Sequence, residues 1–162
     1  LSISPELYFY VLVRHALKDA GIDDLGVADY VAANLADYAH GDPMAALNST
    51  GSTAFNYHID FLKAIDEATT YEKFFLQVRC GNQFMLLTGL FPRFLRHRRD
   101  RRGAPGVRFY EQVASDAFLR ASDHPLAEEF ELTNVYHTLA DQFSETRCAL
   151  NHLASEYLFL DV

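Results

Sequence analysis

The sequence predicts an all-α protein: an irregular bundle of about six or seven helices with a long C-terminal helix, in a single domain over residues 1–162. Three observations lead to this prediction. Apolar residues recur at helical spacing through most of the chain. Residues that start and stop helices flank these runs, and no run alternates as a strand would. With 162 residues, 49% of them hydrophobic and 22% charged, the chain can bury a core of its own.

The first predicted helix begins after Ser4, a good N-cap, with Pro5 at its first position. It ends before Gly21, and apolar residues on nearly every side predict that it is mostly buried. A second helix, from about residue 25 to residue 39, carries an apolar stripe on one side.

The middle of the chain begins with the longest predicted loop, residues 41–53, where Gly, Pro, Ser and Asn interrupt any helical pattern. A third helix is expected from about residue 54 to residue 68. Thr69 or Thr70 can then cap a fourth helix that extends over residues 71–91.

The last part of the chain holds three predicted helices. One begins at Pro92 and ends at Gly103, and a second covers about residues 107–121. The third is a continuous helix of about 26 residues, roughly 39 Å long, which would be the spine of the bundle or would pair with a second copy. Its seam follows heptad spacing through Leu132, Tyr136, Leu139, Phe143, Thr146, Leu150, Leu153 and Tyr157.

Arginine is concentrated in one short stretch, since seven of the eleven arginines lie between residues 93 and 108. The seven are Arg93, Arg96, Arg98, Arg99, Arg101, Arg102 and Arg108. With Asp100 they give this stretch a charge of +6, so the rest of the chain must carry −14 to reach the net −8. A helix end favours one or two cations, so the surplus predicts contacts with carboxylates or phosphates.

The sequence leaves several sources of these carboxylates or phosphates possible. An acidic surface, on the same chain or on a second subunit of a homodimer, is the simplest interpretation because the rest of the chain is acidic. Nucleic acid is a minor alternative, because a nucleic-acid-binding domain is normally basic overall and often interleaves aromatic residues with its cations.

A second region of interest interrupts the fourth predicted helix. Gly81 and Asn82 are poor residues for a helix interior. Gly81 and Gly89 fall on roughly the same side of the helix, which favours close packing of a neighbouring helix. The alternative is a kink that places Arg79, Asn82 and Gln83 in a ligand pocket.

Arg14 and His15 complete the pocket candidates, since a buried arginine needs a partner and a histidine can transfer protons near neutral pH. No metal site is predicted, because His137 and His152 would lie about 22 Å apart along one helix. No catalytic motif is present and no cofactor is predicted, so whether the chain is an enzyme stays open.

The two cysteines, Cys80 and Cys148, form no CxxC spacing and predict reduced thiols in a cytoplasmic protein. The chain has no run of 18 apolar residues, so no membrane span is predicted. The leading hypothesis is a non-enzymatic interaction or regulatory module whose arginine-rich helix faces an acidic surface. The alternative is a small-molecule-binding or enzymatic bundle with a polar pocket near residues 79–83.

Overall fold

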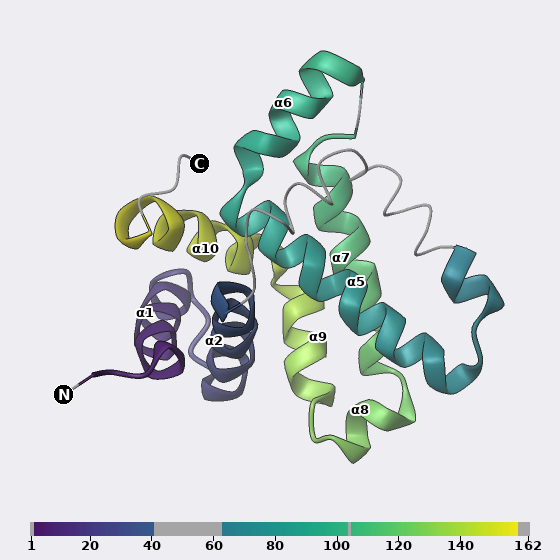
Figure 1. Cartoon of the computed structure of the whole chain (residues 1–162). Helices are drawn as coiled ribbons and strands as arrows, with labels where there is room; N and C mark the ends of the chain where they lie inside the picture. Colours follow the sequence, from purple (N-terminus) through teal and green to yellow (C-terminus); the bar gives the residue numbers. More distant parts are fainter. Residues whose placement is uncertain (1, 41–62, 104, 159–162) are drawn as a thin grey trace.

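The computed structural model describes residues 2–40, 63–103 and 105–158, and within these ranges all regular secondary structure is helical (Figure 1). The helices are α1 (Pro5–Asp19), α2 (Leu25–His40), α5 (Thr70–Leu90), α6 (Pro92–Arg102), α7 (Val107–Ser122), α8 (Pro125–Glu129), α9 (Thr133–Asp141) and α10 (Phe143–Tyr157). Residues 63–67 are helical as well. The all-α prediction is confirmed, whereas the predicted loop 41–53 and most of the predicted helix 54–68 lie outside the described residues.

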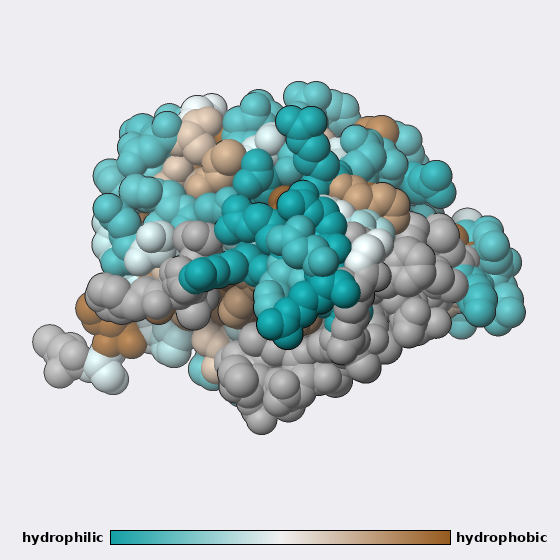
Figure 2. Space-filling view, turned by 90° about the horizontal axis from the view of Figure 1, so that it is seen from above, coloured by the Kyte–Doolittle hydropathy of each residue, from teal (hydrophilic) through white to brown (hydrophobic). Residues whose placement is uncertain are grey.

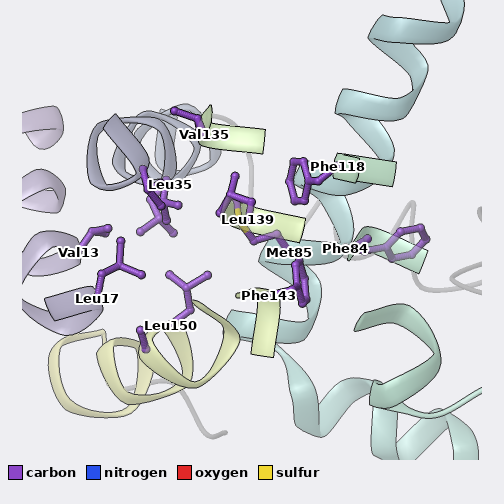
Figure 3. Close-up of a cluster of buried hydrophobic side chains, with 14 of the residues drawn as sticks. Val13, Leu17, Leu35, Phe84, Met85, Phe118, Val135, Leu139, Phe143 and Leu150 are labelled. Carbon is purple, nitrogen blue, oxygen red and sulfur yellow. The ribbon is translucent and has the colours of Figure 1, made fainter. Parts of the chain in front are cut away.

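The core lies around α5, the longest of the described helices. This helix packs on α7 and α10, α7 packs on α9, and α1 packs on α2 and α10. Side chains from all six of these helices meet in the core that Figure 3 shows, among them Leu17, Leu35, Met85, Phe118, Leu139 and Leu150. No helix of the described residues is both long enough and apolar enough to cross a membrane.

Helix α1 begins as predicted, because the Ser4 side chain accepts a hydrogen bond from the Leu7 amide at 3.2 Å. The prediction that this helix is mostly buried is wrong. Only one stripe is covered, and Leu7 and Val11 on the outer side are 54% and 58% exposed. The reason is position: α1 is at the edge of the bundle, and the covered stripe faces α2 and α10 (Figure 1).

Helix α5 continues without a break through Gly81, so the glycine does not mark a kink. A Cβ atom on Gly81 would lie 2.7 Å from the Phe118 ring of α7, and one on Gly89 would lie 2.7 Å from Leu150 of α10. The two glycines therefore admit two neighbouring helices at close range, which confirms the packing interpretation.

The heptad stripe near the C-terminus is buried from Tyr136 to Leu153, whereas Leu132 is half-buried and Tyr157 is 41% exposed. The helix that carries the stripe is not continuous. Gln142, with φ −115° and ψ 38°, separates α9 from α10, and the C-terminal helix has 15 residues. Tyr136 and Leu139 face the core before the break, and Leu150 and Leu153 face it afterwards. Because α9 packs on α7 while α10 packs on α5 and α1, the stripe is buried against two sets of partners.

Candidate functional site, an arginine-lined groove

Helix α6 projects from the bundle because only its first turn has apolar anchors. Pro92 is buried, Leu95 is 1% exposed and Phe94 is half-buried, and most later residues face solvent. The helix ends at Gly103, whose φ of 65° is in the left-handed region that glycine adopts readily. Seen from above α6, Figure 2 shows strongly hydrophilic side chains gathered on this projection.

Four arginines from three helices line a groove of about 590 Å³ at the base of α6: Arg96 and Arg99 from α6, Arg108 from α7 and Arg147 from α10. We call this the arginine groove. Its other described lining residues are Pro92, Gly106, Val107, Glu111, Ser144 and Asn151. Four arginines against the carboxylate of Glu111 give the described lining a charge of +3.

One of the four arginines is held rigidly. Arg147 Nε donates to Glu111 Oε2 at 2.7 Å, and Arg147 Nη1 donates to Asn151 Oδ1 at 2.9 Å. Asn151 Nδ2 in turn donates to the carbonyl oxygens of Thr88 at 3.1 Å and Gly89 at 2.6 Å, in the last turn of α5. This network fixes the back of the groove and uses two of the five N–H donors of the Arg147 guanidinium.

The other three arginines are exposed at the mouth of the groove. Arg99 reaches the neighbouring Asp100, with Nε and Nη2 each 3.3 Å from Oδ1, but both side chains are more than half exposed. Such a pair is well screened by water and neutralises little of the local field. Like charges converging from α6, α7 and α10 repel one another, so an anion entering the groove relieves that repulsion.

The backbone adds to the positive potential. Residues from the first turns of three helices line the groove: Pro92 in α6, Val107 in α7 and Ser144 in α10. In the described structure the N-cap residues of these three helices make no side-chain cap hydrogen bond. Helix N-termini carry a partial positive charge and attract carboxylates and phosphates, so the helix dipoles act in the same direction as the arginines.

Three of the seven arginines that the sequence singled out therefore meet in the groove: Arg96, Arg99 and Arg108. Sequence reasoning missed Arg147 and its partner Glu111. The available signal was local, since Arg147 and Asn151 are four residues apart on a helix and can bond to each other. That α10 passes beside α6 depends on helix packing, which spacing does not report.

The remaining four arginines of the cluster have other surroundings. Arg98 is half-buried, with its guanidinium carbon 5.9 Å from the centre of the Phe94 ring. Arg93 and Arg101 are exposed on α6, and the side chain of Arg102 lies outside the described part of the chain.

The polar candidates on α5 are spread between two environments. Asn82 Oδ1 accepts a hydrogen bond from the Tyr30 hydroxyl at 2.6 Å, which joins α5 to α2, and burial raises the pKa of Tyr30. Gln83 is half-buried, whereas Arg79 is exposed and lines a shallow hollow with Glu72. The Asn82 amide thus has a structural partner already.

Arg14 and His15 are exposed on α1, a helix that packs on α2 and α10. His15 Nε2 is 3.5 Å from Asp19 Oδ2, an exposed contact within one helix. Arg14 is exposed, whereas its choice as a pocket candidate assumed a buried arginine that needs a partner. Across the described residues, no three His, Cys, Asp or Glu side chains are grouped as a metal site requires.

The chain matches no family model, no curated protein and no solved structure. The geometry and charge of the groove are therefore the observations that bear on its function.

Proposed function

We propose that this protein is a non-enzymatic interaction module that binds an acidic protein surface through the arginine groove. One observation carries the proposal: four arginines from three helices converge on a groove whose described lining includes one carboxylate. A guanidinium offers two parallel N–H donors to a carboxylate, which suits arginine rather than lysine to recognition of aspartate and glutamate side chains.

The positive charge of the groove is not neutralised by its own described lining, which favours binding of an anion. Glu111 is the carboxylate that could neutralise it from within, and it is held by Arg147 at 2.7 Å. Arg96, Arg99 and Arg108 retain N–H donors that an external anion could accept. Exposed charges of one sign also steer an oppositely charged partner and speed its association at low salt.

A second copy of the chain is one acidic partner, and we propose a homodimer as the form of assembly that needs no other protein. Outside residues 93–108 the chain carries a charge of −14, so a second copy would supply carboxylates for these arginines. The proposal holds for a different acidic protein as well, and the measurement below separates the two.

Charge reversal tests the proposal. In the triple variant Arg96→Glu, Arg99→Glu and Arg108→Glu, we expect the affinity for a labelled oligoglutamate peptide to fall by about 3- to 150-fold, because three exposed ion pairs of about 0.2–1 kcal/mol each are lost. Fluorescence anisotropy at several salt concentrations measures this. Native mass spectrometry of the same samples shows whether a dimer of 18.4 kDa chains is lost as well.

The matched control makes the same change of charge elsewhere: Arg14→Glu, Arg79→Glu and Arg120→Glu, all at exposed positions outside the arginine groove. It should retain affinity within about twofold, with circular dichroism confirming that both triple variants are folded. Equal losses in the two variants would mean that net charge alone drives binding, and no loss in either would contradict the proposal.

A further inference from the structure

A second hollow of about 380 Å³ adjoins the arginine groove along α7. The two hollows share the lining residues Arg108, Glu111 and Ser144, so they lie next to each other, and we call them together the trough. The remaining described lining of the second hollow consists of Gln112, Ser115, Ala140, Asp141 and Phe143.

The two ends of this trough have opposite charge. The arginine groove carries +3 in its described lining, as counted above. In the second hollow the charged residues are Arg108, Glu111 and Asp141, which together carry −1. Asp141 is exposed and is the last residue of α9, where the helix dipole adds a partial negative charge.

Helix α7 forms a continuous wall of the trough and sets its length. Arg108, Glu111 and Ser115 follow one another at intervals of three and four residues, so they lie on one side of the helix. From Arg108 to Ser115 the helix rises about 10 Å. An extended chain covers this distance in about three residues.

The floor of the second hollow is fixed by a hydrogen bond between helices. Ser115 Oγ donates to the Ala140 carbonyl oxygen at 2.6 Å, which holds α7 against the end of α9. Beside it, Phe143 is 2% exposed and belongs to the core. Both ends of the trough are therefore anchored, one by this bond and the other by the Arg147 network.

We infer that the trough binds an extended segment of a partner protein with two acidic residues followed, about three residues later, by a basic residue. The acidic side chains lie among the four arginines, and the basic side chain lies beside Asp141. The inference rests on the proposed function, because it names the occupant of the same groove. A nucleic acid, which is anionic along its whole length, would be repelled at the Asp141 end.

Three labelled peptides test the arrangement: Glu-Glu-Ser-Gly-Lys, the same peptide with glutamine in place of the lysine, and Glu-Glu-Lys. We expect the first to bind the native protein about two- to fivefold more tightly than either of the others, the range that one exposed ion pair gives. Asp141→Asn should abolish this preference and leave the affinity for the glutamine peptide unchanged. The control Asp37→Asn, at an exposed position on α2, should leave all three affinities unchanged.

The outcomes separate this inference from the proposal it rests on. If the lysine and glutamine peptides bind equally and Asp141→Asn has no effect, the inference is wrong while the acidic-partner proposal stands. If no peptide binds the native protein, both fail. If a single-stranded DNA oligonucleotide binds more tightly than every peptide, and more tightly still to Asp141→Asn, the occupant is nucleic acid and the inference is overturned.

Discussion

Replacement of Gly81 by alanine tests the closest approach between α5 and α7. A Cβ atom at this position would lie 2.7, 2.8 and 2.9 Å from Cε1, Cζ and Cδ1 of Phe118. The Phe118 ring is fully buried, with its centre 5.9 Å from that of Tyr136 and 6.3 Å from that of Phe143. It cannot move away from the new methyl group without displacing another ring.

Two opposing effects set the size of the change in the free energy of unfolding. Alanine is favoured over glycine in a helix interior by about 1 kcal/mol. An additional methyl group in a packed core costs about 1–3 kcal/mol. Because three ring atoms would be closer than 3.0 Å, we place the steric cost at the upper end and expect Gly81→Ala to lose about 1–2 kcal/mol.

Urea denaturation followed by circular dichroism measures the loss. Gly26→Ala is the matched control, since its Cβ would meet only Asp24 Oδ1 at 3.3 Å and Val135 Cγ2 at 3.4 Å, and we expect a change within about 0.5 kcal/mol. In the Phe118→Leu background the cost of Gly81→Ala should shrink. A Gly81→Ala protein as stable as the native one would refute the packing argument.

Four further predictions concern the capping box of α5, the end of α6 and the two thiols. Thr69→Ala removes a capping box and should lower the free energy of unfolding by about 1 kcal/mol in urea denaturation. Hydrogen bonds from the Thr69 backbone and side chain lower the pKa of Glu72. The native protein should therefore have a larger free energy of unfolding than Glu72→Gln above the unfolded-state pKa of about 4.3, and this difference should vanish as the pH falls through the folded-state pKa. A difference in stability that does not depend on pH would contradict this. Gly103→Ala places a side chain at φ 65°, a cost of about 1–2 kcal/mol that should appear as faster amide exchange in α6, and unchanged exchange would count against it. Exposed Cys148 should react with a chromogenic disulfide reagent in the native protein, whereas Cys80, whose pKa burial raises to about 12, should react only after unfolding; two native equivalents would refute this assignment.

Helix ends were the most predictable part of the fold, because residue chemistry marks them directly. Ser4 and Thr69 accept the hydrogen bonds expected of N-caps, and Gly103 adopts the left-handed conformation expected at a C-terminus. The break at Gln142 was not predictable, because a heptad pattern reports which side of a helix is buried and not whether one partner or several bury it. The exposure of α1 was missed for a related reason, since apolar residues on all sides do not reveal that a helix is at an edge.

The candidate site was half predictable. The arginines of α6 and α7 stand out because they are close in sequence, whereas Arg147 lies 39 residues beyond Arg108 and belongs to the groove only because α10 crosses near α5 and α6. That crossing depends on tertiary contacts such as Gly89 against Leu150. Asn82 illustrates the same dependence: a poor helix former at that position accepts a hydrogen bond from Tyr30 on another helix, which sequence spacing does not report.

The way α6 is anchored separates what holds the helix from what it displays. Pro92 and Leu95 are buried, while Arg96, Arg99 and Arg101 face solvent, where substitutions usually change stability by less than about 0.5 kcal/mol. During evolution, a few substitutions at these exposed positions can therefore change the charge of the groove without changing the core. The same separation makes α6 a natural place to install a new specificity by directed evolution, with the bundle serving as an unchanged scaffold.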